Sequence, residues 1–178
     1  MVYMFLADGF EEVEALAPLD LIRRAGAEVK TVGVTGEYIT GAHDITVKAD
    51  IALLDVDLKN MDALILPGGL GGTNNMDASS DVKRIVQYAA DNKKIICAIC
   101  AAPSILGKMG LLEGKDATCY PGFEDSFKGG NYINKSVVKC DNFITADGMG
   151  SAYKFGFEII SELFDEKTAE KIKEQIQY

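Results

Sequence analysis

Short apolar segments alternate with longer amphipathic segments along most of this sequence. The short segments are rich in β-branched residues, a pattern typical of strands buried on both faces of a parallel sheet. The expected strands are Val2–Ala7, Val29–Val34, Ala63–Leu66, Lys94–Ile99, Asp116–Cys119, Ser136–Lys139 and Phe143–Ala146. Because these strands alternate with helices, the sequence predicts an α/β fold with a mostly parallel sheet between two layers of helices.

The longer segments place apolar residues on one face of a helix. The expected helices are Glu11–Arg24, Ser80–Asn92, Pro103–Met109, Ser151–Phe164 and Glu166–Gln175. Pro18 lies within the first and predicts a break, a kink or a helix start, because proline has no amide hydrogen for the helical ladder. Turn residues and alternating polarity predict a hairpin or edge strand over Gly36–Val47, with Asp50–Leu54 as a candidate extension of it.

The 178 residues contain no internal repeat or linker, so we expect a single domain over residues 1–178. The formal net charge of −9 argues against nucleic acid or an anionic membrane surface as a partner. No apolar run is long enough to span a bilayer, and the N-terminal segment lacks the basic leader of a signal peptide. Four cysteines suit a reducing compartment better than a disulfide framework, so we expect a cytoplasmic protein.

Cys100 stands between the apolar run that ends at Ile99 and a helix that Pro103 is suited to begin. Ala98 and Ala102, two residues away on either side, are small, which is the steric requirement of a nucleophile elbow. In such a turn the side chain lies near free backbone N–H groups and the positive end of a helix dipole, and both favour the thiolate. The sequence therefore predicts a reactive thiol that is ionised near neutrality, and the alternative is a small buried hydrophobic residue.

Two further loops are expected to meet this cysteine at the carboxyl ends of the parallel strands, where open sheets bind ligands. One is Asp8–Glu14. The other is the glycine-rich loop Pro67–Asn75, which either presents N–H groups to an oxyanion or simply forms a tight connection. Glu11 and Glu12 are expected to complement a helix dipole. Glu14 has apolar neighbours, and a carboxyl group in an apolar cleft has a raised pKa suited to proton transfer.

The remaining cysteine and histidine patterns argue against two other kinds of site. Cys97 and Cys100 have the spacing of a redox pair, but such a pair needs both sulfurs at the helix start, and Cys97 falls inside the expected strand. His43 is the only histidine, so we expect no zinc site, no other metal and no cofactor. We interpret His43 as a partly exposed turn residue and Glu14 as the candidate for proton transfer beside Cys100.

Four motifs together resemble the ThiJ/PfpI superfamily. They are Asp8-Gly9-Phe10-Glu11-Glu12-Val13-Glu14, Arg23-Arg24-Ala25-Gly26, Leu66-Pro67-Gly68-Gly69 and Ala98-Ile99-Cys100-Ala101-Ala102-Pro103. The combination is most similar to the branch of the Parkinson-disease-linked protein deglycase (DJ-one), over essentially the whole chain. The resemblance implies a flavodoxin-like three-layer α/β/α sandwich of the class I glutamine amidotransferase type, usually a homodimer.

The resemblance also implies roles for individual residues. Cys100 would be the elbow nucleophile, and a protonated Glu14 would bond to its sulfur. The backbone N–H groups of Gly69 and Ala101 would form the oxyanion hole. The substrate or anion pocket implied in this way comprises Arg24, Gly68, His43 and Tyr120.

At several positions the sequence departs from the superfamily's pattern. Ala101 stands where the intracellular-protease branch has the histidine of its triad, which disfavours a peptidase or amidase. Tyr120 replaces a histidine, and His43 replaces an arginine. Ala146-Asp147-Gly148-Met149-Gly150 stands where the superfamily commonly has Ser-Arg-Gly-Pro-Gly. These changes alter the charge of the pocket and leave the substrate open.

Two functions follow as hypotheses. The first is a glyoxalase-III-like or deglycase-like enzyme that acts through Cys100 and Glu14 on small α-oxoaldehydes such as methylglyoxal, or on their adducts. The second is a redox-sensing stress-response protein in which Cys100 is oxidised to a sulfinate without turnover. The expected partners are a small carbonyl substrate and a second copy of the chain.

Overall fold

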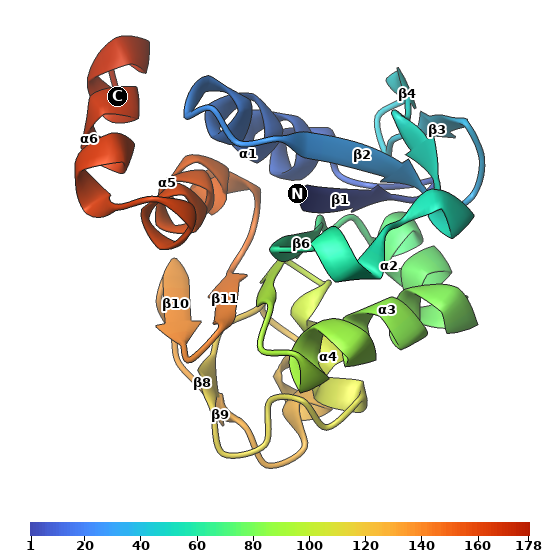
Figure 1. Cartoon of the computed structure of the whole chain (residues 1–178). Helices are drawn as coiled ribbons and strands as arrows, with labels where there is room; N and C mark the ends of the chain where they lie inside the picture. Colours follow the sequence, from blue (N-terminus) through green and yellow to red (C-terminus); the bar gives the residue numbers. More distant parts are fainter.

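The computed structural model describes residues 1–178 and is built around a seven-stranded sheet (Figure 1). In spatial order its strands are β10 (Val137–Cys140), β11 (Phe143–Ala146), β7 (Ile95–Ile99), β6 (Ala63–Leu66), β1 (Val2–Leu6), β2 (Val29–Gly33) and β5 (Ile51–Ala52). All neighbouring strands are parallel except β10, which pairs antiparallel with β11. The mostly parallel sheet predicted from the sequence is confirmed.

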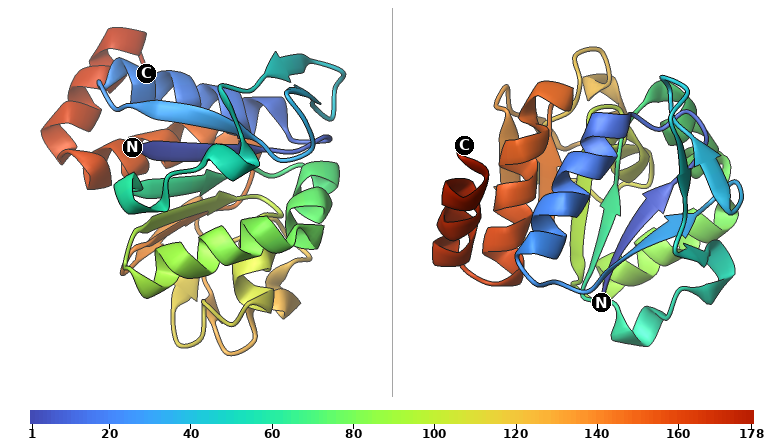
Figure 2. Two further views of the ribbon diagram at one scale, coloured as in Figure 1. Left: turned by 45° about the vertical axis from the view of Figure 1, so that its right-hand side comes forward. Right: turned by 90° about the horizontal axis from the view of Figure 1, so that it is seen from above.

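Helices cover both faces of this sheet and complete a three-layer α/β/α sandwich (Figures 1 and 2). One layer contains α1 (Glu12–Arg24), α5 (Ala152–Leu163) and α6 (Glu166–Ile176), and the other contains α2 (Leu70–Ala78), α3 (Ser80–Asp91) and α4 (Pro103–Lys108). In β1, Met4 and Leu6 pack into the core with α1 and α5, whereas Tyr3 and Phe5 pack into the core with α3 and α4. Burial on both faces explains why the strands are uninterrupted apolar runs.

Smaller elements lie outside the main sheet. β3 (Tyr38–Thr40) and β4 (Thr46–Lys48) form an antiparallel hairpin, as the sequence predicts, and β8 (Asp116–Ala117) pairs in parallel with β9 (Asn131–Tyr132). Short 3-10 helices occur at Leu53–Asp55, Leu58–Asn60, Glu124–Phe127 and Met149–Ser151. None of the helices has both the length and the apolar character needed to cross a membrane.

Three expectations about individual elements are wrong, and a fourth is wrong in part. Asp50–Leu54 does not extend the hairpin, because β5 pairs in parallel with β2 at the edge of the main sheet. Asp116–Cys119 forms only the two-residue β8, outside the main sheet. The glycine-rich segment is a loop only as far as Gly69, because α2 starts at Leu70. Helix α1 continues through Pro18 without a break or a new start, because packing against α5 stabilises the helix despite the missing hydrogen bond; the alternative of a kink stays a prediction.

Candidate active site

Cys100 occupies a strained turn at the carboxyl end of β7. Its φ of 65° lies in the left-handed region, which residues with a Cβ rarely adopt. Its N–H donates to the carbonyl of Ala146, and its own carbonyl accepts the N–H of Tyr120. Helix α4 then begins with Pro103 in its first turn. This is the geometry of a nucleophile elbow, and Cys100 is half-buried rather than enclosed in the core.

The glycine-rich loop and the loop after β1 meet beside Cys100. The N–H of Glu11 donates to the carbonyl of Gly68 at 3.0 Å. A Cβ on Gly68 would lie 2.3 Å from a carboxylate oxygen of Glu14 and 2.6 Å from the Cβ of Cys100, so a larger residue would displace both. Gly69 has a φ of +83° and no room for a Cβ against the main chain of the loop after β1. The loops expected at the carboxyl ends of the strands therefore touch one another.

Three groups surround the sulfur of Cys100. The backbone N–H groups of Gly69 and Ala101, the two residues expected to form an oxyanion hole, lie close enough to lower the pKa of the thiol. The carboxyl group of Glu14, in the first turn of α1, lies close enough to raise it. The same carboxyl group accepts the N–H of Gly68 at 3.0 Å. A cysteine, a carboxyl group and two N–H donors thus share one small site.

Glu14 is almost completely buried, with 1% of its surface exposed. Burial raises the pKa of its carboxyl group to about 7; the hydrogen bonds with Cys100 and Gly68 oppose this increase, and the charge of Glu11 adds to it. A carboxyl group with this pKa can accept or release a proton near neutral pH.

The sulfur alone does not ionise near neutrality, which corrects the expectation of a thiolate. Burial raises the pKa of the Cys100 thiol to about 12, and the charge and hydrogen bond of Glu14 add to the increase, while the N–H groups of Gly69 and Ala101 lower it. Of the two groups, the carboxyl group of Glu14 is therefore the one that titrates near neutral pH.

Glu11 has a positioning role that was not expected from the sequence. Its carboxylate caps α1 by accepting the N–H of Glu14 at 2.7 Å, while its own N–H fixes the carbonyl of Gly68. An acceptor side chain three residues before Glu14, at the start of a helix, is a capping pattern that the sequence does carry. The contact with Gly68 has no such signal, because the two loops are distant in the chain.

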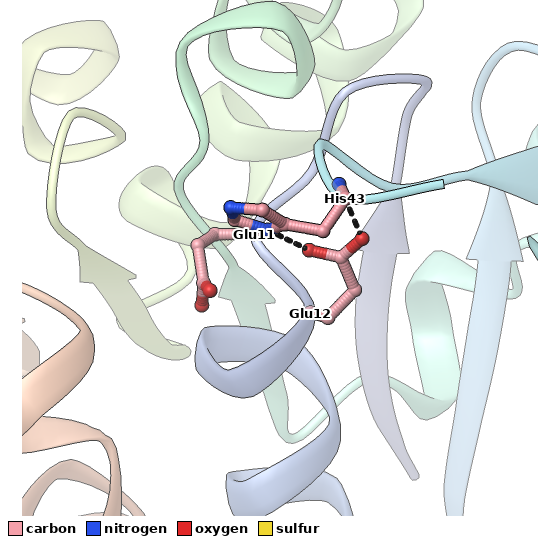
Figure 3. A group of neighbouring side chains, drawn as sticks. All are labelled: Glu11, Glu12 and His43. Atoms are coloured by element: carbon pink, nitrogen blue, oxygen red, sulfur yellow. Dashed lines mark hydrogen bonds and ion pairs between the residues drawn. The ribbon is translucent and has the colours of Figure 1, made fainter. Parts of the chain in front are cut away.

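His43 lies between β3 and β4 and contacts Glu12 (Figure 3). Its backbone N–H donates to one carboxylate oxygen of Glu12 at 2.7 Å, and its ring nitrogen Nδ1 lies 2.8 Å from the other. The histidine side chain is 72% exposed, whereas that of Glu12 is only 6% exposed. The contact fastens the hairpin to the first turn of α1, two residues before Glu14. Glu12 therefore does more than complement the helix dipole.

The same cluster contains the residues best placed to hold a metal ion. Glu11, Glu12 and His43 each offer a ligand atom, and these atoms lie within 4.8 Å of one another. Several of these atoms already have partners, however, because both carboxylate oxygens of Glu12 bond to His43 and one carboxylate oxygen of Glu11 accepts the N–H of Glu14. The N-terminus of α1 also disfavours a cation, since it is the positive end of the helix dipole. The arrangement is that of a hydrogen-bonded clamp.

We expect replacement of His43 with alanine to lower the midpoint of thermal unfolding only where the imidazole is protonated. The hydrogen bond with Glu12 raises the pKa of His43 above 6.5. A raised histidine pKa contributes stability that is complete below the unfolded value and disappears as the pH rises through the folded value. Melting curves of both proteins should therefore differ at about pH 6 and coincide at about pH 9.

The contact between His43 and Glu12 is also lost at low pH, where Glu12 becomes protonated. Burial acts to raise the pKa of Glu12, but hydrogen bonds from His43 outweigh it and lower the pKa below 4.5. The contribution of Glu12 is therefore present above its unfolded value and is lost as the pH falls through the lower folded value. Equal differences between the two proteins at both test pH values would contradict a charged contact.

Within this chain Arg24 lies far from Cys100, and its place in an anion pocket stays a prediction. It lies at the opposite end of α1 from Glu14, and at about 1.5 Å per helical residue the distance between them is about 15 Å. Its guanidinium group pairs with Asp20 on the surface. His43 contacts Glu12 through its backbone N–H and Nδ1. Of the expected pocket residues, Gly68 and Tyr120 lie next to Cys100, and Tyr120 is 51% exposed.

Comparisons with known proteins agree with this geometry. Residues 1–162 match the DJ-1/PfpI family. Protein dj-1beta of Drosophila melanogaster is 37% identical over 172 residues, which cover 95% of this chain and 92% of that protein. Deglycase TK1284 of Thermococcus kodakarensis is 32% identical over 164 residues, which cover 91% of this chain and 98% of that protein.

Solved structures show the same fold. The crystal structure of Drosophila melanogaster DJ-1beta is similar with a TM-score of 0.94 at 35% identity, covering 99% of this chain and 96% of that chain. The structure of oxidized Toxoplasma gondii DJ-1 is similar with a TM-score of 0.95 at 32% identity, covering 99% of this chain and 97% of that chain. By sequence and by structure, this chain belongs to the DJ-1/PfpI family.

Proposed function

We propose that this protein is a cysteine-dependent enzyme of the glyoxalase III or deglycase type, which acts on small α-oxoaldehydes such as methylglyoxal or on their adducts. The proposal rests on one observation: the sulfur of Cys100 contacts both the carboxyl group of Glu14 and two backbone N–H donors. Addition to a carbonyl group requires a nucleophile, a proton acceptor and donors for the developing oxyanion, and these contacts supply all three.

The reaction would begin with addition of the sulfur to the aldehyde carbon of methylglyoxal. As the carbon–sulfur bond forms, the thiol proton passes to the Glu14 carboxylate, and the aldehyde oxygen becomes an oxyanion bound by the N–H groups of Gly69 and Ala101. Glu14 then returns the proton to this oxygen, which gives a hemithioacetal on Cys100.

Glu14, again a carboxylate, would next remove the hydrogen of the former aldehyde carbon as a proton. Return of a proton to the adjacent ketone carbon, together with transfer of the hydroxyl proton to the former ketone oxygen, converts the hemithioacetal into a thioester of lactate. Water then hydrolyses the thioester, which releases lactate and restores the thiol of Cys100. One carbon is oxidised as its neighbour is reduced, so the balance is methylglyoxal plus water giving lactate, without an external oxidant.

The relatives support the reaction class. The protein from Thermococcus kodakarensis that is 32% identical to this chain is named as a deglycase. Two further parts of the proposal come from the resemblance and the composition: assembly as a homodimer and a cytoplasmic location.

A turnover assay tests the proposal. Purified protein is incubated with methylglyoxal, or with a peptide carrying a methylglyoxal adduct, and both loss of the substrate and formation of lactate are followed. We expect one lactate per methylglyoxal consumed, over many turnovers. If the methylglyoxal consumed did not exceed the molar amount of protein, and no lactate formed, Cys100 would only be modified by the aldehyde. That result would contradict an enzymatic role.

A redox-sensing role without turnover is the second candidate. The observation that favours it is the same set of donors, because the N–H groups of Gly69 and Ala101 and a protonated Glu14 would also hold a sulfinate on Cys100. The relative from Toxoplasma gondii was solved in an oxidized form. Mild peroxide treatment followed by mass spectrometry should then add two oxygen atoms to Cys100 and none to half-buried Cys140. Equal oxidation of the two cysteines would contradict sensing.

A further inference from the structure

An open pocket of about 360 Å³ borders the Cys100 turn. Two of its lining residues are connected to the main chain of Cys100 by hydrogen bonds, Tyr120 directly and Asp147 through its neighbour Ala146. Tyr120 donates its N–H to the carbonyl of Cys100 at 2.8 Å. Asp147 directly follows Ala146, whose carbonyl accepts the N–H of Cys100 at 2.9 Å. These main-chain contacts place the pocket beside the Cys100 turn.

Large side chains with exposed apolar surface line the pocket. Tyr120 is 51% exposed, Met149 is 52% exposed and Tyr132 is 37% exposed. Apolar surface gathered at the rim of a pocket indicates a binding site more often than chance exposure does. The two tyrosines, one on β9 and one in the segment after β8, offer aromatic faces that bind flat apolar groups and cations.

The charge of the pocket is negative. Asp147 is the only charged residue that lines it. One carboxylate oxygen of Asp147 accepts the hydroxyl of Ser151 at 2.5 Å, and no lysine or arginine neutralises it. Burial is the largest cause of the raised pKa of Tyr132, and the charges of Cys119, Glu124 and Asp147 add to it, so two carboxylates lie near this phenol.

We propose that this pocket binds the group attached to the reacting carbonyl carbon, and that Asp147 and the two tyrosines make it favour a cationic or aromatic group over a carboxylate. The inference rests on the proposed function, because it names the carbonyl compounds that the Cys100 site takes. A cationic group gains the attraction of Asp147 and of the faces of Tyr120 and Tyr132. A carboxylate in the same place meets a like charge and no basic partner.

Charge-matched thiol reagents test the pocket without relying on turnover. The cationic trimethylammonioethyl and the anionic sulfonatoethyl methanethiosulfonates are each reacted with the intact protein, and the modification of Cys100 is followed by mass spectrometry of its peptide. The ratio of the cationic to the anionic reaction rate is also measured at half-buried Cys140 on β10. This reference corrects for the overall net charge of −9, which acts on both cysteines. We expect the cation-to-anion rate ratio at Cys100 to exceed that at Cys140 by about tenfold.

Variants show whether the pocket causes the preference. Asp147→Asn keeps an oxygen for the Ser151 hydroxyl but removes the charge, and it should remove most of the excess ratio. Met149→Glu adds a carboxylate at the exposed rim and should increase the ratio. Asp91→Asn is the matched control: it changes the net charge by the same amount as Asp147→Asn, but at the end of α3, near the other end of β7. It should leave the ratio unchanged.

Three results would overturn the inference: a ratio at Cys100 no greater than that at Cys140, no change in Asp147→Asn, or a Cys100 that reacts with neither reagent. These results are distinct from failure of the proposed function. If the protein forms no lactate but shows the charge preference, the proposed enzymatic function is wrong and the proposed binding pocket stands. If it forms lactate without the preference, the enzymatic function stands and the binding pocket is wrong.

Discussion

Replacing Cys100 with alanine is expected to lower kcat/KM for methylglyoxal by at least about a thousandfold. The reason lies in the contacts of the sulfur. The carboxyl group of Glu14 and the N–H groups of Gly69 and Ala101 converge on this one atom, so without it the base has no nucleophile to activate and the donors have no oxyanion to bind. Loss of methylglyoxal and formation of lactate, measured on the same samples, give the two rates.

Cys140→Ala is the matched control for this experiment. Cys140 is also half-buried, and its removal deletes one thiol without touching the site, so this variant should keep the wild-type rate. Melting curves of both variants show whether the fold is intact. If Cys100→Ala kept more than about a tenth of the wild-type activity while remaining folded, another group would have to carry out the addition, and the scheme through Cys100 would fail.

The elbow around Cys100 could be predicted because its requirements are local. A buried strand, small residues at Ala98 and Ala102, and a helix that begins at Pro103 are all visible within a few residues of the cysteine. The fold class could be predicted for a related reason, since strands covered on both faces appear as short apolar runs. Helix α2 (Leu70–Ala78) was missed, because glycines weaken the helix signal in that segment.

The ionisation of the site could not be predicted in the same way. The pKa values of Cys100 and Glu14 depend on how deeply the two groups are buried against each other, and they come from segments far apart in the chain. The bond between His43 and Glu12 also joins a hairpin to a helix, which no spacing rule indicates. The distance between Arg24 and Glu14 likewise depends on how far α1 continues past Pro18, which the motif alone does not show.

Glutamine at position 14 is expected to remove most of the rate and its dependence on pH. The amide can still accept the N–H of Gly68 and donate to the sulfur of Cys100, as a protonated carboxyl group does, but it cannot take up a proton. Wild-type activity should rise with pH through about 7, where Glu14 loses its proton. The variant should show no such rise, and its kcat should be lower by about 10² to 10⁴. Exposed Glu174→Gln is the control and should behave as wild type.

The same substitution should stabilise the fold at neutral and alkaline pH, which separates lost catalysis from lost structure. The pKa of Glu14 is raised from 4.5 to about 7, so the folded chain holds this proton more tightly than the unfolded chain. Stability from a raised carboxyl pKa is complete below the unfolded value and is lost as the pH rises through the folded value. The wild type should therefore lose roughly 3 kcal/mol between these two values, and Glu14→Gln should not. Denaturant midpoints should place the variant above the wild type at about pH 8. If the stability of the wild type instead increased relative to that of Glu14→Gln as the pH rises from about 4.5 to about 8, the ionised form of Glu14 would stabilise the fold, and the pKa of Glu14 would not be raised.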